Sequence, residues 1–120
     1  MLKTYKVALT IDRYSSSDSA SVPITGYLKG LFCTAGAMDD GDTYTVAITD
    51  EHSATVFSRA SLAGNTTTTI WADKYNELST TKVEGALLNT PMAGDITLTV
   101  TSSSQQDVAA VDYTVAIYYE

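Results

Sequence analysis

The sequence predicts an all-β fold, a two-sheet antiparallel sandwich that is jelly-roll-like and has about eight strands. Ser and Thr supply about a quarter of the residues, whereas the helix formers Glu, Lys and Gln are scarce. Apolar and polar residues alternate with a period of two along most segments, as in half-buried strands. Turn-forming residues separate these segments at intervals of about 8 to 15 residues.

The length of 120 residues predicts a single domain, a β-sandwich that spans residues 1–120. A chain of this size buries about two thirds of its surface when it folds, which is enough for an independent core. Cys33 is the single cysteine, so no internal disulfide supports the fold. Because Cys33 lies in an apolar run, we interpret it as a buried, unreactive thiol.

In the first third of the chain, residues 3–12 alternate clearly and predict the first strand. The Ser-rich residues 13–21 predict a mobile loop, because they offer little to bury. Residues 21–34 predict the next strand. Pro23 near its start favours an edge position or a strand entry.

The middle of the chain predicts a hairpin and then a Thr-rich strand. Residues 43–50 alternate, residues 50–54 form a short turn, and residues 56–58 return antiparallel. Four consecutive threonines in residues 66–71 favour a further strand. The segment 72–81 is too short and too weakly amphipathic for a helix, so we expect a long loop.

The C-terminal third predicts three more strands, at residues 82–90, 95–103 and 112–120, with PMAG and SSQQD as turns between them. The last strand alternates almost to the terminus, so the C-terminal segment is expected to be structural. The alternation also predicts which side chains form the core: Val7, Leu9, Ile48, Leu98, Val115 and Ile117.

The charge pattern argues against two classes of partner. The formal net charge is −7, and the seven Lys and Arg residues are not clustered, so we expect no nucleic-acid binding. No stretch approaches the ~18 apolar residues that span a membrane, and we expect no membrane partner. The N-terminal residues alternate from the start and lack the features of a signal peptide, so we expect production in a cytosol.

The sequence offers no catalytic constellation, and we predict that the protein is not an enzyme. The single histidine, His52, lies in a polar turn without an identifiable catalytic partner. Neither a nucleophile elbow nor a glycine-rich phosphate-binding loop is found, and one His with one Cys is insufficient for zinc. We therefore expect no catalytic, cofactor-binding or metal-binding residues and no cofactor.

An acidic turn keeps one alternative open. Asp39, Asp40 and Asp42 surround Gly41 and could present oxygen atoms to calcium. The distant Glu of an EF-hand loop is missing, and Asp-Gly runs are ordinary turn formers. We interpret the segment as a plain acidic turn, and the sequence leaves calcium binding undecided.

Aromatic side chains are the better indicators of a binding surface, because exposed aromatics commonly anchor protein contacts. We expect contacts at Trp71, Tyr75 and Leu78, in or beside the loop of residues 73–81. The Ser-rich loop of residues 15–21 is the alternative contact surface. Trp71 has a second interpretation as a plug that closes one end of the core.

The order of the segments resembles the small β-sandwich virion proteins of tailed bacteriophages. The resemblance covers most of the chain and rests on short motifs: a P-I-x-G-x-L strand, a strand that ends in Asp before a hairpin, a V-x-G-x-L strand and a final aromatic strand. The matching positions are Pro23, Ile24, Gly26, Leu28, Asp50, Val83, Gly85 and Leu87.

This resemblance implies a capsid cement or decoration protein. Such a protein binds the major capsid protein on the outside of the head, is assembled in the host cytoplasm and stabilises the shell. Binding at threefold points of the lattice makes a homotrimer the expected state. The alternative is a carbohydrate- or receptor-binding β module of a phage tail or fibre, which would use aromatics that line a groove.

Overall fold

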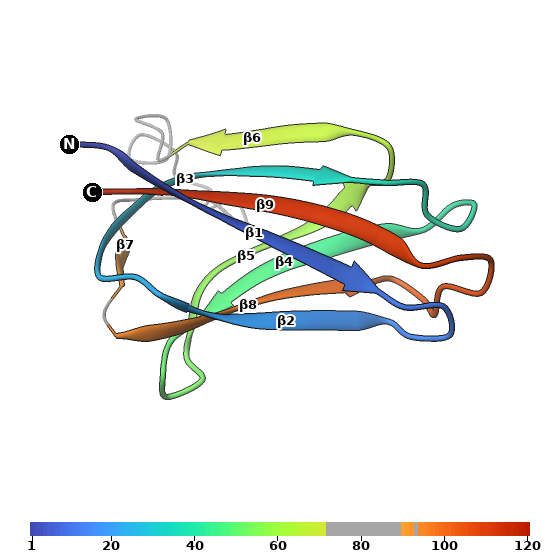
Figure 1. The fold of residues 1–120 in the computed structure, drawn as a ribbon, viewed down its shortest axis with the longest axis horizontal. Coiled ribbons are helices and arrows are strands. Elements are labelled where there is room, and N and C mark those ends of the chain that lie inside the picture. The colour runs from blue at the N-terminus through green and yellow to red at the C-terminus, as the bar shows by residue number, and fades with distance from the viewer. Residues whose placement is uncertain (72–89, 93) are drawn as a thin grey trace, which may run out of the picture.

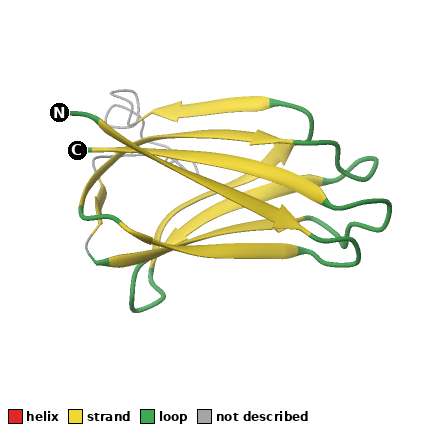
Figure 2. Ribbon diagram, in the orientation of Figure 1, coloured by secondary structure: helices red, strands yellow, loops and turns green. Residues whose placement is uncertain are grey.

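The computed structural model describes residues 1–71, 90–92 and 94–120. These residues contain no helix, and Figure 2 shows strands joined by loops. The strands are β1 (Lys3–Ile11), β2 (Ser17–Pro23), β3 (Gly26–Ala35), β4 (Thr43–Thr49), β5 (Thr55–Ala63), β6 (Thr67–Trp71), β7 (Thr90–Met92), β8 (Asp95–Ser102) and β9 (Val111–Tyr119).

Two antiparallel sheets face each other (Figure 1). One has the order β1-β9-β3-β6, with β7 also paired to β3, and the other has the order β2-β8-β4-β5. The pairs β4·β5, β3·β6, β2·β8 and β1·β9 are concentric in the sequence, as in a long hairpin rolled into two sheets. This arrangement is a jelly roll, and it confirms the predicted fold class.

The core lies between the sheets and contains the inward side of each alternating strand. All six predicted core residues are buried: Val7, Leu9, Ile48, Leu98, Val115 and Ile117. Cys33 is also fully buried, as predicted, and burial raises the pKa of its thiol to about 12. The rings of Tyr44 and Tyr113 meet edge to face in this core, with their centroids 5.0 Å apart.

The C-terminal strand is structural, because β9 lies between β1 and β3 in the centre of its sheet. Beyond it, Glu120 and Tyr27 exchange two main-chain hydrogen bonds of 2.9 and 3.0 Å. The N-terminal amine lies 3.7 Å from a carboxylate oxygen of Glu120. The two chain ends are therefore neighbours at one end of the sandwich (Figure 1).

The prediction of a loop at residues 13–21 is wrong from Ser17 onward, where β2 begins and pairs with β8. The serines of β2 face outward on an edge strand, whereas Val22 faces the core. A strand of this kind needs only one apolar side chain in two, and Ser at the alternate positions concealed the pattern. The alternative contact surface at residues 15–21 is thus mostly a strand and not a loop.

Two further boundaries differ from the prediction. Residues 21–34 form the end of β2 and most of β3, because the chain crosses between the sheets at residues 24–25. Pro23 is the last residue of the edge strand β2, so the predicted edge position is correct and the alternative of a strand entry is not. The returning strand β5 continues to Ala63, and part of the expected PMAG turn belongs to β7.

The strands β6 and β7 occupy the same side of β3. Trp71, the last residue of β6, is paired with Gly30, and Thr90, the first residue of β7, is paired with Leu28. Trp71 and Thr90, which are far apart in the sequence, therefore lie near each other along this edge. The predicted strand at residues 82–90 lies outside the described residues except for Thr90.

Candidate functional site

An aromatic pair lies on the outer face of the five-stranded sheet. The rings of Trp71 and Tyr118 are stacked, with centroids 4.8 Å apart and planes inclined by 20°. These residues belong to β6 and β9, the two strands that flank β3. The interpretation of Trp71 as a plug of the core is wrong, because 48% of its surface is exposed.

Gly30 makes this stacking possible. It is paired with Trp71 on one side and with Tyr118 on the other, so it lies between the two aromatics. A Cβ atom at Gly30 would lie 2.6 Å from Trp71 Cε3 and 2.9 Å from the carbonyl oxygen of Ile70. Glycine therefore provides the space in which the indole ring lies across the middle strand.

The strand registers place the neighbours of this pair on the same outer face. We call this set the aromatic face, and it consists of Trp71, Tyr118, Phe32, Ala116, Thr4, Lys6 and Thr69. Lys6 is its single charged member. A carboxylate on the same outer side of the sheet is that of Asp112, which is paired with Thr10 and accepts a hydrogen bond from its hydroxyl. Aromatics surrounded by small and hydroxyl side chains are typical of a contact surface.

Of the predicted contact residues, the structure places only Trp71. Tyr75 and Leu78 lie outside the described residues, as does the predicted contact loop at residues 73–81, so they stay predictions. The segment that holds them follows Trp71 directly and thus starts from the aromatic face.

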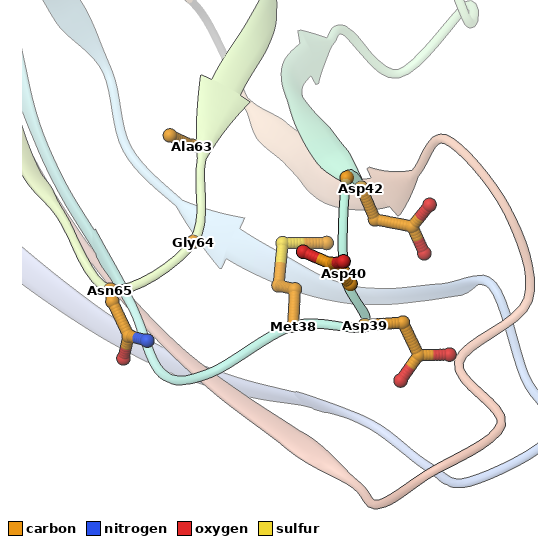
Figure 3. Close-up of a pocket in the computed structure, with 8 residues that line it drawn as sticks. Met38, Asp39, Asp40, Asp42, Ala63, Gly64 and Asn65 are labelled. Atoms are coloured by element: carbon orange, nitrogen blue, oxygen red, sulfur yellow. The ribbon is translucent and has the colours of Figure 1, made fainter.

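The acidic turn lies at the opposite end of the sandwich, beside a surface pocket of about 210 Å³ (Figure 3). Met38, Gly64 and Asn65 form part of its wall. Figure 3 shows the carboxylates of Asp39 and Asp42 directed away from Gly64. Asp39, Asp40 and Asp42 thus line the pocket, but the carboxylates of Asp39 and Asp42 do not point across it.

The carboxylates of Asp39 and Asp42 bind groups of the β8–β9 loop. Asp39 accepts hydrogen bonds from the main-chain amides of Asp107 and Val108, at 2.7 and 3.3 Å. Asp42 accepts them from the Ser104 hydroxyl, at 2.8 Å, and from the Gln106 amide, at 2.7 Å. The acidic turn therefore fastens one loop to another, which is a structural role.

Gln106 is the centre of this connection and is fully buried. Its side-chain oxygen accepts a hydrogen bond from the Asp39 amide, and its side-chain nitrogen also donates to the carbonyl oxygen of Ser104. Its main chain bonds to Tyr14 and Ser15, in the β1–β2 loop. Three loops meet at this one residue, and we call the arrangement the loop clamp.

The loop clamp also determines the electrostatics of Asp42. The hydrogen bond from Ser104 is the main cause that lowers the pKa of this carboxyl below its ordinary value, partly opposed by desolvation and supported by Gln106 and Ser103. Across residues 1–71, 90–92 and 94–120, no group of three His, Cys, Asp or Glu side chains could hold a metal ion.

His52 is an exposed turn residue, as predicted. Its imidazole lies 3.4 Å from a carboxylate oxygen of Glu51, and both side chains are largely in solvent. Asp50 orders the turn, because its carboxylate accepts hydrogen bonds from the amides of His52 and Ala54. The described part of the chain also contains no helix that is long and apolar enough to cross a membrane.

Sequence reasoning missed the role of Gln106 and the pairing of Trp71 with Tyr118. Gln106 lies in a polar linker, and nothing in that linker distinguishes a buried Gln from an exposed one such as its neighbour Gln105. The partnership of Trp71 with Tyr118 depends on strands that are distant in the sequence. Gly30 carried a usable signal, because a glycine inside a strand marks a close approach.

Searches against family models and against curated proteins find no match. Solved structures align over nearly the whole chain at low similarity. The acid-stable capsid structure of Helicobacter pylori bacteriophage KHP30 aligns over 100% of this chain and 94% of its own, with 10% identity and a TM-score of 0.37. The virus-like particle of the prawn Macrobrachium rosenbergii extra small virus aligns over 98% and 79%, with 14% identity and a TM-score of 0.32.

The VP2 subviral particle of infectious bursal disease virus aligns over 99% of this chain, with 15% identity and a TM-score of 0.43. The alignment covers 33% of that chain, so the present chain spans about a third of its length. None of these alignments is close enough to assign a function to this protein.

Proposed function

We propose that this protein is a virion structural protein of a tailed bacteriophage: a capsid decoration protein that binds the major capsid protein on the outside of the head. The sequence motifs that resemble small virion proteins support this proposal. The jelly roll is compatible with it, because this fold serves in capsid proteins as well as in lectins, although a fold alone does not determine a function.

The observation that carries the proposal is the exposed aromatic pair. The Trp71 ring stacks on Tyr118 and packs against the main chain at Gly30, so its position is fixed before a partner binds. A rigid aromatic anchor loses little conformational entropy on binding. A binding protein of this type needs a presented surface and no reactive groups.

We further propose that the protein acts as a homotrimer at threefold points of the lattice. Several linked contacts raise the overall affinity, so each copy needs only a modest contact area. The expected partners are therefore the major capsid protein and two further copies of this chain. The domain proposed for this role is the whole of residues 1–120.

A glycan- or receptor-binding module of a tail or fibre is the second candidate. The same exposed indole favours it, because Trp71 is flanked by hydroxyl side chains such as Thr69 that can bond to a sugar. A glycan array separates the two functions. Specific glycan binding that is lost in Trp71→Ala, together with no binding to capsids, would favour the module over the decoration protein.

The decisive experiment uses phage heads that lack the protein. Purified protein is added, the heads are sedimented, and their rupture on heating is followed. We expect co-sedimentation, extra density on the shell and a higher rupture temperature. Heads that neither bind the protein nor gain stability would refute the proposal.

A matched pair of variants tests the surface. Trp71→Ala removes the exposed anchor, whereas Tyr14→Ala removes an aromatic side chain that is 59% exposed and belongs to the β1–β2 loop at the opposite end. We expect a loss of head binding in the first variant and none in the second. Equal binding by both variants would remove the aromatic face from the proposal.

A further inference from the structure

The described part of the sandwich has five edge strands, and an edge strand presents main-chain N–H and C=O groups that a further strand can bind. Four of the five are short or irregular. The strand β2 carries Asp18 and ends in Pro23, and β5 pairs with β4 through two register shifts. The strands β6 and β7, which share one edge, have five and three residues. The strand β1 has nine residues and pairs with β9 in one unbroken register.

The direction of the free groups on β1 follows from one hydrogen bond. The main-chain amide of Thr10 donates to a carboxylate oxygen of Asp18, at 3.0 Å, and therefore points away from β9. Main-chain groups alternate along a strand, so the amides and carbonyls of Thr4, Lys6 and Ala8 point to the same side. No described residue forms a hydrogen bond with these groups. Asp18 thus caps one end of an edge whose remaining groups are unpaired among the described residues.

The charges of β1 indicate the kind of strand that fits this edge. The Lys6 side chain is exposed, and the Nζ atom of Lys3 lies 5.8 Å from the centre of the Tyr119 ring. The strand contains no carboxylate. Two copies paired through β1 would bring their lysines into one short ladder, which is unfavourable, whereas a strand with carboxylates at alternate positions would gain attraction.

We propose that the edge at residues 4–8 accepts an extended acidic segment of the capsid subunit as an additional strand. This inference rests on the proposed function and specifies how the partner is held. Main-chain hydrogen bonds supply the attachment, and Lys6 selects for acidic side chains. The edge adjoins the aromatic face, because Thr4 is paired with Tyr118 and Lys6 with Ala116.

Two proline variants test the edge. Ala8→Pro removes an amide that points away from β9, so the β1·β9 ladder keeps its hydrogen bonds. Ser21→Pro is the matched control on the edge strand β2. The Ser19 amide donates to the Asp18 side chain and therefore points away from β8. The Ser21 amide, two residues further on, points the same way, so its loss also leaves the β2·β8 ladder intact. We expect binding to heads to fall at least tenfold in Ala8→Pro and to stay within twofold in Ser21→Pro. Thermal melting confirms that both are folded.

Lys6→Glu tests the same edge without a change in the backbone. We expect weaker head binding at low salt than in Lys6→Gln, since charge reversal adds repulsion to the loss of attraction. If both Ala8→Pro and Lys6→Glu bind heads as the native protein does, the inference is overturned. It is also overturned if Ala8→Pro only dissociates a dimer of this chain.

A peptide titration separates this inference from the proposed function. A synthetic peptide of alternating Glu and Val is added to ¹⁵N-labelled protein, with an alternating Lys and Val peptide as the control. We expect shifts of the amide signals of Thr4, Lys6 and Ala8 with the acidic peptide only. If the acidic peptide shifts these signals but the protein does not bind heads, the decoration role is refuted and strand addition at β1 is kept. If the protein binds heads but the peptide causes no shifts, strand addition at β1 is refuted.

Discussion

Replacement of Gln106 by Leu should weaken the fold far more than its position in a polar loop suggests. Leu has a similar volume but cannot form the three side-chain hydrogen bonds of Gln106, which have lengths of 2.7, 2.9 and 3.2 Å. At about 1 kcal/mol for each bond, the free energy of unfolding should fall by about 3 kcal/mol. For a chain of this size, this corresponds to a drop in Tm of roughly 10 °C.

Gln105→Leu is the control, because its side chain is exposed and should change stability by no more than about 0.5 kcal/mol. Urea unfolding followed by Trp71 fluorescence and by circular dichroism measures both variants. Coincident transitions would justify two-state analysis. If Gln106→Leu were as stable as Gln105→Leu, the hydrogen bonds of the loop clamp would contribute nothing to the free energy of unfolding, and the idea that they fasten the loops would be refuted.

Three further predictions follow from individual side chains. Gly30→Ala should cost about 1–3 kcal/mol, because the new methyl group meets the Trp71 ring and the Ile70 carbonyl oxygen. A double-mutant cycle with Trp71→Ala should relieve the part of this loss that the ring causes, and a loss of equal size in both backgrounds would refute the contact. Tyr44→Phe and Tyr113→Phe should leave thermal stability unchanged or raise it by about 1 kcal/mol, since both hydroxyls are buried without a hydrogen-bond partner among the described residues; a clear loss in either would show that its hydroxyl is bonded in solution. Ionised Asp42 should stabilise the fold fully above its ordinary pKa of 3.8, and this stabilisation should be lost as the pH falls through its lowered folded-state pKa. Asp42→Asn should therefore flatten the acid side of the profile of unfolding free energy against pH. A profile as steep as that of the native protein would count against the loop clamp.

The sequence was sufficient for the fold class because alternation is a local property. In β4 and β8 the large apolar side chains face the core and the threonines alternate with them on the outer face, and the six predicted core residues are buried. The prediction failed at β2, where a serine-rich edge strand needs few apolar residues. Edge strands are half solvated, so their composition approaches that of loops.

The sites were harder to predict because they depend on contacts between distant segments. Trp71 could be selected as an exposed aromatic, but its stacking partner Tyr118 is brought near only by the order β9-β3-β6. The acidic turn was interpreted as a structural turn, and the hydrogen bonds of Asp39 and Asp42 agree with that interpretation. Its actual partner, the loop that contains Gln106, is more than sixty positions away.

The concentric strand pairing orders the folding reaction by the entropy of loop closure. The hairpin β4·β5 closes only the short turn after Thr49, whereas β1·β9 joins the two ends of the chain. Because closure becomes less favourable as the intervening chain lengthens, the outer pairs gain most if the inner pairs have already formed. The chain should thus pair outward from this turn, and a covalent link between the neighbouring residues Met1 and Glu120 would remove this order by making β1·β9 a local pair as well.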